Sequence, residues 1–518
     1  MEFPFISAIL TTTFVGALVI MMLPKNKHLA IKLVAAISSF IVLALSGTLF
    51  FLFDRAKSGF QFIEKILWLP QLGITYQVGI DGIGLAMILL TGIIIFTGVL
   101  ISWHEFIPGG LLGKTGRPRE YFILLLLLVT GVFGVFVSLD LFFLFLFYEL
   151  AVLPMYLLIG IWGTGRKEYA GMKLTLYLLL GSALILAGIL VMYFMSGLKT
   201  FDWFVLNACN LPKNLQLVIF PVVFIGFGIL AGLWPFHTWS PDGHASAPSA
   251  VSMLHAGVLM KLGAFSIIRV ALPLLPYGAK VWCPYIVFLT VVNIVYGALA
   301  AMSQKDLKYV VAYSSVSHMG IVLLGICSLN VLSLNGAVFQ MFSHGIMTGL
   351  FFALVGCVYG RAHTRILSEM GGLAKLMPFL AVAFSIGGLA SLGLPGTSGF
   401  VAEFLVLLGA FQSYPALTVI AATGVVITAI YVLRVLQKIF FGQLSAQYIS
   451  QEKYVGSKNS ASGHGDHPIM ISDATVLEKI PLSILMFFLI ILGVWPLLLT
   501  DVINSGVVAV LQKTGGIF

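Results

Sequence analysis

The stretch that decides the fold covers residues 215–244 and reads LQLVIFPVVFIGFGILAGLWPFHTWSPDGH. Its first part is apolar over the roughly 20 residues that a helix needs to cross a bilayer. The run is then interrupted by Pro235, His237, Pro241 and Gly243. Backbone groups freed inside a membrane must be satisfied by protein or by water in a cavity. We therefore predict a transmembrane helix, the seventh of the chain, that is broken where it lines a cavity.

A second interrupted helix is predicted at 377–411, where Gly393, Pro395 and Gly396 stand in an otherwise apolar run. Two broken helices five spans apart are typical of repeated transporter halves with an ion path at their interface. The sequence therefore predicts two inverted five-helix repeats. The predicted parts of the chain are, in order, N-terminal helices 1–3 (1–120), the first repeat (121–272), the second repeat (281–440), and a polar loop with helix 14 (441–518).

The composition of the whole chain is that of a membrane protein. It is 60% hydrophobic and 9% charged over 518 residues, with a mean hydropathy of +1.07. This predicts an all-α polytopic membrane protein with about fourteen transmembrane helices. We expect a short hairpin or interfacial segment at 54–79 and a loop or surface helix at 442–476. The expected spans are 3–23, 30–53, 82–102, 121–138, 141–161, 172–195, 215–236, 248–271, 281–302, 308–328, 332–359, 377–411, 415–440 and 480–500.

Charge and cysteine usage narrow the function further. The net charge is +9, and lysine and arginine concentrate in one set of alternating loops, which places both termini outside and the first loop in the cytoplasm. Anionic lipids, and not nucleic acid, are the expected partners of this charge. The four cysteines form no CxxC pair, and no nucleotide-binding loop is present. His464 and His467 could bind a metal, but a solvated loop is the simpler interpretation.

Three charged residues, Glu149, Lys261 and Glu403, lie well inside predicted spans. A charge at that depth costs roughly 2.5–3.5 kcal/mol on insertion scales. Burial disfavours the charged form of a carboxylate or a lysine, which suits each of them to reversible protonation. The alternatives are a structural ion pair for Glu149, snorkelling for Lys261, and a cap on freed backbone donors for Glu403. We interpret the three as a path for protons or ions.

Histidines could connect these charges, because an imidazole titrates near neutrality and can donate and accept at once. The alternative for each is a satisfied polar group in the core. Two lysines beside the tenth span complete the set of candidates. The candidate relay residues are His237, His255, His318, His344, Lys305 and Lys308.

Four stretches of the chain resemble the antiporter-like subunits of respiratory complex I. Together they are highly specific, and the resemblance covers about 79–442. They correspond to the fifth helix, the exit of the seventh helix, the tenth helix and the twelfth helix of that family. The stretches are 147–163 (FYELAVLPMY, then GIWG), 235–248 (PFHTW, PD, H and AP), 312–320 (AYSSVSHMG) and 389–404 (LASLGLPG, then EF).

Within this family the chain is most similar to the M-type subunits. Glu403 stands where the sister L- and N-type subunits usually carry lysine, and 361–365 (RAHTR) also looks M-like. The resemblance implies proton pumping driven by quinone reduction elsewhere in an NADH dehydrogenase complex. It also implies sister antiporter-like subunits as partners and a bacterial inner membrane or an equivalent energy-conserving membrane. No cofactor is expected in this chain, since flavin, iron–sulfur clusters and quinone would belong to partner subunits.

One departure from the family concerns the seventh helix. The family places a lysine about seven residues before the histidine of its PFH motif, and here Leu230 occupies that place. Glu149 therefore lacks its usual partner. Either His237 or His255 substitutes, or the subunit pumps differently or not at all. We favour His255, which lies six residues before Lys261, about 9 Å along a helix.

Several functions share this fold and these charges. Besides a complex I subunit, the sequence is compatible with a subunit of a multisubunit cation/proton antiporter or of a membrane-bound hydrogenase. A structural, non-pumping spacer is a further alternative because of Leu230. Fold alone does not separate these functions.

Overall fold

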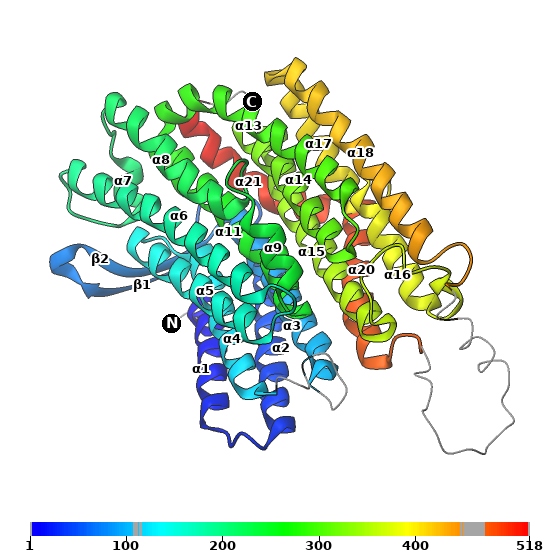
Figure 1. Ribbon diagram of the computed structural model, residues 1–518. Helices are drawn as coiled ribbons and strands as arrows, with labels where there is room; N and C mark the ends of the chain where they lie inside the picture. The colour runs from blue at the N-terminus through cyan, green and yellow to red at the C-terminus, as the bar shows by residue number, and fades with distance from the viewer. Residues whose placement is uncertain (1–2, 107–111, 113–115, 446–447, 449–471, 516–518) are drawn as a thin grey trace, which may run out of the picture.

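The computed structural model describes all residues except 1–2, 107–111, 113–115, 446–447, 449–471 and 516–518. Most helices run side by side in one bundle (Figure 1). The first half contains α1 (Phe5–Met22), α2 (His28–Leu52), α3 (Gly82–Glu105), α4 (Pro118–Val137), α5 (Leu141–Trp162), α6 (Lys167–Met195), α7 (Trp203–Ala208), α8 (Lys213–Ala231) and α9 (Trp239–Ser246). The second half contains α10 (Ser249–Leu254), α11 (Met260–Ser266), α12 (Leu272–Leu274), α13 (Pro276–Ser303), α14 (Leu307–Cys327), α15 (Val331–Ala362), α16 (Pro378–Ser391), α17 (Ser398–Ser413), α18 (Pro415–Ile439), α20 (Val476–Val494) and α21 (Leu497–Thr514).

The number of membrane spans agrees with the prediction. Within the described residues, 13 helical stretches are long and apolar enough to cross a membrane. The two shorter apolar helices α16 and α17 follow one another, and together they form the interrupted twelfth span. The predicted all-α membrane fold with about fourteen spans is therefore confirmed. The division into repeats at 121–272 and 281–440 stays a prediction.

Both predicted helix breaks are present. The first separates α8 from α9, and the second separates α16 from α17. Gly232 at the end of α8 has φ +77°, and Gly393 just after α16 has φ +73°. A left-handed residue is a common way to end a helix, and glycine adopts it without a steric penalty from a Cβ. The glycines of the sequence pattern thus end the first half of each broken helix.

The eighth span is less regular than predicted. It is continuous from Ser249 to Leu274, but two of its segments, His255–Leu259 and Ile267–Ala271, are π-helical. They flank the short helix α11, which carries Lys261. A π-helical turn shifts the backbone hydrogen bonds by one residue and is frequent at functional sites. Nothing in the apolar pattern of the sequence distinguishes these segments from a plain α-helix.

The segment at 54–79 forms the expected hairpin. Strands β1 (Gln61–Leu69) and β2 (Ile74–Ile80) pair antiparallel, and the hairpin projects from the bundle beyond α5 and α6 (Figure 1). Asp140, between α4 and α5, accepts hydrogen bonds from the backbone of Thr75 and of Phe142. Burial raises the pKa of the Asp140 carboxyl to about 6, although these hydrogen bonds oppose the shift. Asp140 thereby ties the hairpin to the start of α5.

The C-terminal end differs from the prediction. We expected one last helix at 480–500, but α20 ends at Val494 and α21 begins at Leu497. Pro496 stands between them and lacks the N–H that would continue α20. α21 packs against α3 and α15 and approaches α3 so closely that a Cβ on Gly82 would lie 1.7 Å from the Val502 carbonyl oxygen. The chain therefore has a further packed helix, α21, after the fourteenth span.

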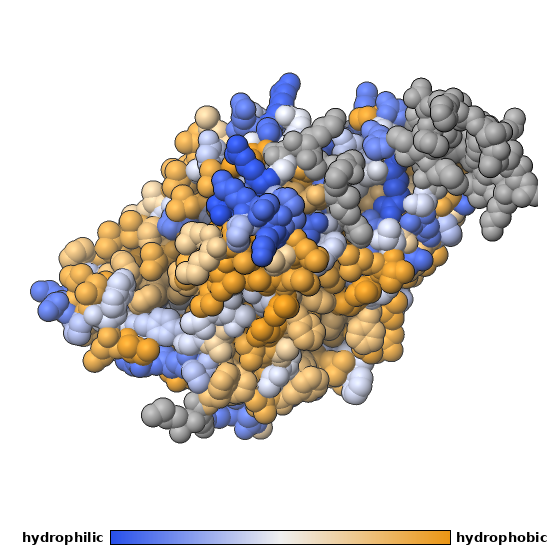
Figure 2. Space-filling view, turned by 90° about the horizontal axis from the view of Figure 1, so that it is seen from below, coloured by the Kyte–Doolittle hydropathy of each residue, from blue (hydrophilic) through white to orange (hydrophobic). Residues whose placement is uncertain are grey.

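The surface has the distribution expected of a membrane bundle. Seen from below, hydrophilic residues gather over the ends of the helices and hydrophobic residues cover the flanks (Figure 2). Large exposed apolar side chains occur along outer helices, including Phe40 on α2, Leu176 on α6 and Ile430 on α18. In water such flanks would be unfavourable, so they mark the surface that faces lipid or neighbouring membrane subunits.

Helix α11 is held close to α8 by a glycine. A Cβ on Gly263 would lie 2.3 Å from the Phe227 carbonyl oxygen and 2.6 Å from the Ala231 nitrogen. Because both are backbone atoms, Gly263→Ala must push the two helices apart, and we expect a loss of about 1–3 kcal/mol of stability. Thermal unfolding in detergent measures this loss of stability. The control is Gly47→Ala in α2, where a Cβ meets nothing within 4 Å; equal unfolding temperatures for the two variants would contradict the prediction.

Candidate functional site

Lys261 lies at the centre of the bundle with none of its surface exposed. Its Nζ is 2.7 Å from Nδ1 of His344 on α15. It also donates a hydrogen bond to the carbonyl of Ala256, which belongs to the first π-helical segment. The snorkelling alternative is therefore wrong, because the ammonium head remains inside the protein. The irregular backbone supplies one of its two partners.

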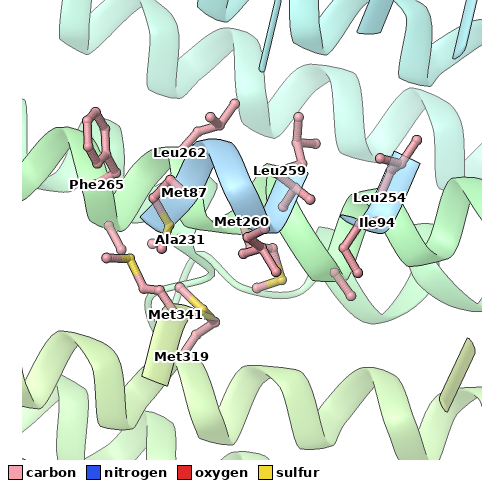
Figure 3. Close-up of a cluster of buried hydrophobic side chains, with 14 of the residues drawn as sticks. Met87, Ile94, Ala231, Leu254, Leu259, Met260, Leu262, Phe265, Met319 and Met341 are labelled. Atoms are coloured by element: carbon pink, nitrogen blue, oxygen red, sulfur yellow. The ribbon is translucent and has the colours of Figure 1, made fainter. Parts of the chain in front are cut away.

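The surroundings of this lysine are apolar. Met260 and Leu262 are its neighbours on α11, and Met319 of α14 and Met341 of α15 lie beside that segment (Figure 3). All four side chains are fully buried. A low local dielectric strengthens polar interactions and makes an unpaired charge costly. The protonation of Lys261 must therefore depend strongly on its few polar neighbours.

His344 lies next to a second histidine, His318, which contacts the buried carboxylate of Glu403. The rings of His344 and His318 are 5.3 Å apart between centroids. Nδ1 of His318, on α14, is 3.0 Å from Oε1 of Glu403 on α17. The other ring nitrogen of His318 is 3.3 Å from the hydroxyl of Ser391. Lys261, His344, His318 and Glu403 thus form a line of titratable groups, which we call the central chain.

Glu403 owes its place to the second helix break. It lies in α17, shortly after the break, and is 5% exposed. A Cβ on Gly393 would lie 3.1 Å from Oε2 of Glu403, so the missing side chain leaves space for the carboxylate. The carboxylate contacts His318 and not freed backbone donors, which replaces the expected alternative of a cap. Each member of the central chain can bind a proton, and neighbouring members are in contact or separated by a few ångströms.

Two further histidines form a second buried cluster near Lys261. The rings of His244 and His255 are 3.9 Å apart between centroids, and Trp239 stacks on His255 at 5.3 Å. Within the described residues, both ring nitrogens of His255 lack a hydrogen-bond partner, and so does Nδ1 of His244. Buried polar groups without protein partners are typically satisfied by water. His244 is also within electrostatic range of Lys261.

Sequence reasoning did not assign a role to His244, although it stands in the motif of the broken seventh helix. The signal was present in its position, because a polar residue beside a helix break tends to face a cavity. The structure places His255 against His244 and Trp239, and its role in a relay stays a prediction. No contact of His255 with Glu149 is found in the described part of the chain, so its proposed substitution for the missing lysine stays a prediction.

Glu149, the third of the charges predicted inside the spans, is separate from the central chain. Glu149 is half-buried on α5, less deeply than we expected, because that face of α5 also carries exposed side chains such as Leu153. Its Oε1 has no hydrogen-bond partner among the described residues. Leu230 is fully buried on α8. The family's lysine position on α8 therefore holds an apolar side chain that cannot pair with Glu149.

An ion pair that the sequence reasoning missed lies at the broken seventh helix. Lys173 of α6 is 2.7 Å from Asp242 of α9, and the hydroxyl of Tyr309 donates to the same carboxylate at 3.2 Å. His237, 2% exposed, packs against the ring of Tyr296 at 5.0 Å. Both nitrogens of His237 lack hydrogen-bond partners where the chain is described. The structure thus places His237 beside this cluster and not in the central chain.

The two candidate lysines of the tenth span have different positions. Lys308 is 6% exposed and donates to the carbonyl of Ala247 at the end of α9. Lys305 is exposed, in the turn just before Asp306, the N-terminal cap of α14. Lys305 as a member of a buried relay is therefore wrong. The Lys305 side chain belongs to the surface turn between α13 and α14.

The possible metal pair His464 and His467 lies outside the described residues. Within the described ranges, no group of three or more histidine, cysteine, aspartate or glutamate side chains is arranged to hold a metal ion.

The fold and the site define a polytopic membrane protein in which titratable side chains are buried between broken helices. The chain belongs to the NADH:quinone oxidoreductase/Mrp antiporter transmembrane family, whose profile matches residues 138–428. It is 37% identical to NADH-quinone oxidoreductase subunit M of Rhodobacter capsulatus over 93% of this chain and 90% of the relative. It is also 37% identical to NAD(P)H-quinone oxidoreductase chain 4 of Gloeobacter violaceus, over 88% of this chain and 86% of the relative.

Solved structures give the same assignment. A chain of respiratory complex I from Thermus thermophilus matches with a TM-score of 0.85 and 28% identity, covering 99% of this chain and 100% of that one. A chain of the Mrp complex from Dietzia matches with a TM-score of 0.82 at 20% identity, over 99% of this chain and 100% of that one. The second likeness shows the shared fold alone.

Proposed function

We propose that this chain is an M-type, antiporter-like subunit of the membrane arm of NADH:quinone oxidoreductase and that it moves protons through the central chain. The observation that carries the proposal is the buried line of titratable groups: Lys261 is 2.7 Å from His344, the rings of His344 and His318 are 5.3 Å apart between centroids, and His318 is 3.0 Å from Glu403. Buried ionisable groups in a membrane are rare and typically mark ion or proton pathways. Relatives named as subunit M or chain 4 of quinone-reducing complexes support the assignment to that enzyme.

Proton movement along the central chain needs no bond rearrangement beyond proton transfer. A proton on Lys261 passes to His344, while the opposite nitrogen of that ring releases one toward His318. His318 delivers a proton to the carboxylate of Glu403, which releases it on the far side. The imidazole can do this because its two nitrogens donate and accept separately. The chain returns to its starting state when Lys261 binds the next proton.

The redox chemistry of the complex belongs, in this proposal, to other subunits. Flavin, iron–sulfur clusters and quinone are expected in those partners, among which are sister antiporter-like membrane subunits. Charge movement in a neighbouring subunit would bias the protonation of Lys261, because a buried charge in a low dielectric responds strongly to other charges. The alternatives of an Mrp-type antiporter or a hydrogenase receive less support, since the Mrp likeness is at 20% identity.

A histidine variant tests the proposed relay. His344→Ala removes the imidazole that lies between Lys261 and His318, and we expect proton flux through this subunit to fall by about 100-fold, the lower range for loss of a proton-transfer group. The intact complex is reconstituted in vesicles, and protons moved per electron are measured together with quinone reduction in the presence of an uncoupler. His28→Ala, an exposed histidine at the start of α2, is the control. An unchanged ratio for His344→Ala would show a structural spacer.

The identity of the complex is tested by its composition. Purification through a tag on this chain should recover flavin and iron–sulfur clusters together with NADH-dependent quinone reduction. Recovery of antiporter subunits without redox centres would overturn the assignment to the quinone-reducing complex.

A further inference from the structure

A second group of buried charges lies at the end of α3, outside the central chain. Glu105 and Lys308 line a cavity together with Ser249 and Gly356. The cavity has a volume of about 30 Å³, which exceeds the roughly 10–15 Å³ that a water molecule requires. Thr164, which is exposed, also lines it. The cavity is therefore open to water at the side of the protein where the lysine- and arginine-rich loops lie.

The packing around Glu105 does not explain why a carboxyl group is buried at this position. Glu105 is 7% exposed, and its Oε2 has no hydrogen-bond partner among the described residues. The carboxyl group interacts with the hydroxyl of Ser249 and, electrostatically, with Lys308. No ion pair of Glu105 is found in the described part of the chain. A buried carboxyl group without a direct cationic partner is costly and tends to be neutral, so it is suited to take up and release a proton.

Polar groups continue from this cavity toward the histidine pair. Lys308 donates to the Ala247 carbonyl, and the hydroxyl of Ser252 donates to the carbonyls of Ala247 and His244 at 3.3 and 3.0 Å. The ring of His244 is within electrostatic range of both Lys308 and Lys261. It also lies against His255, whose nitrogens are without protein partners where the chain is described. Cavity water and these rings can therefore carry protons inward.

We propose that Glu105 and Lys308 form a proton-uptake site that loads Lys261 through His244 and His255. The inference rests on the proposed function, since it supplies the protons that the central chain moves. Glu105 takes a proton from water in the cavity and passes it by water to the histidine pair, and Lys261 receives one proton for each that Glu105 binds. Lys308 provides the positive charge that allows Glu105 to return to its carboxylate form. This route reaches Lys261 without a charge at the position that Leu230 occupies on α8.

The test replaces Glu105 by glutamine in the intact complex in vesicles. Glu105→Gln keeps the shape and the hydrogen-bonding capacity of the side chain but cannot carry a proton. We expect the proton-to-electron ratio to fall as far as in Lys261→Ala, with uncoupled quinone reduction retained. Glu105→Asp keeps the carboxyl group and should recover part of the ratio. Glu120→Gln is the matched control, because Glu120 is a half-exposed surface carboxylate beside Lys25 at 3.6 Å.

A second variant tests the cavity without removing a titratable group. A Cβ on Gly356 would lie 2.3 Å from Oγ of Ser249 and 4.0 Å from Oε1 of Glu105. Gly356→Ala should displace Ser249, narrow the water-filled space and lower the ratio. Gly356→Ala also tests the uptake site if the complex that contains Glu105→Gln fails to assemble. Infrared difference spectra should contain a carboxylic acid carbonyl band that Glu105→Gln removes and a merely structural glutamate would not give.

The outcomes separate the two proposals. Full pumping by Glu105→Gln and Gly356→Ala, with pumping lost in Lys261→Ala, overturns the uptake site and leaves the proposed function standing. Full pumping in all three overturns the proposed function as well. Loss of quinone reduction with an unchanged proton-to-electron ratio assigns Glu105 a structural role and also overturns the uptake site.

Discussion

Lys261→Ala is expected to lower the proton-to-electron ratio to that of a complex in which this subunit does not pump. The substitution removes the first member of the central chain, whose Nζ lies 2.7 Å from His344. Loss of a positioned proton-transfer group commonly slows transfer by about 100-fold or more. Because the ammonium group is fully buried, bulk water cannot replace it. The measurement is proton movement per electron in vesicles containing the intact complex, with uncoupled quinone reduction as the reference.

A lysine outside the membrane provides the control. Lys65→Ala removes the same kind of side chain from the hairpin, where Lys65 pairs with Asp202 at 3.0 Å. Its proton-to-electron ratio should equal that of the unmodified complex. Full coupled pumping by Lys261→Ala would show that the buried lysine is structural and would contradict the proposed path. A fall in both variants would indicate a general defect of assembly.

Glu403→Gln is expected to have an effect of similar size at the other end of the chain. Glutamine fits the same space beside Gly393 but cannot accept the proton that His318 delivers. The contact between His318 and the Glu403 carboxylate, 3.0 Å long, is also lost. Protons already on the chain would then have no acceptor, so the proton-to-electron ratio should fall as in Lys261→Ala. Glu403→Asp should retain part of the activity because it keeps the carboxyl group.

Stability must be measured beside pumping for this variant. Removing one member of a buried ion pair can cost about 3–5 kcal/mol when the other charge is left alone. Glutamine keeps the shape of the side chain and an oxygen that can accept a hydrogen bond, so we expect a smaller loss of thermal stability. Glu168→Gln, an exposed glutamate in the first turn of α6, is the control. Normal pumping by Glu403→Gln would exclude Glu403 as a proton acceptor.

Much of the membrane architecture follows directly from the chain. A helix is the available way to satisfy backbone groups in lipid, so each long apolar run had to be a span. The breaks after Ala231 and Ser391 were predictable because glycine and proline cannot continue a helix there. Lys261 and Glu403 were recognisable as site residues because a charge inside an apolar run is costly. Only the position of the last helix, α21, and the exposure of Glu149 departed from that pattern.

The pairing of side chains depends on positions that local sequence does not specify. His344 and His318 meet Lys261 and Glu403 because α15 packs against α14, α17 and the π-helical segment before Lys261, and the separations along the chain range widely. Glu105 gave no clear signal in the sequence because it stands at the end of a span, where a charge is common.

The sequence by itself determined which segments cross the membrane, where two of them break and which charges are too costly to be incidental. These properties depend on the transfer of single residues and backbone groups from water to lipid, which acts on each segment separately. The tertiary structure alone decided that four titratable groups lie in one line, that the rings of His244 and His255 lie against each other, and that Glu105 and Lys308 line one cavity. Those relations depend on distances between helices, and such distances are fixed only when the helices pack.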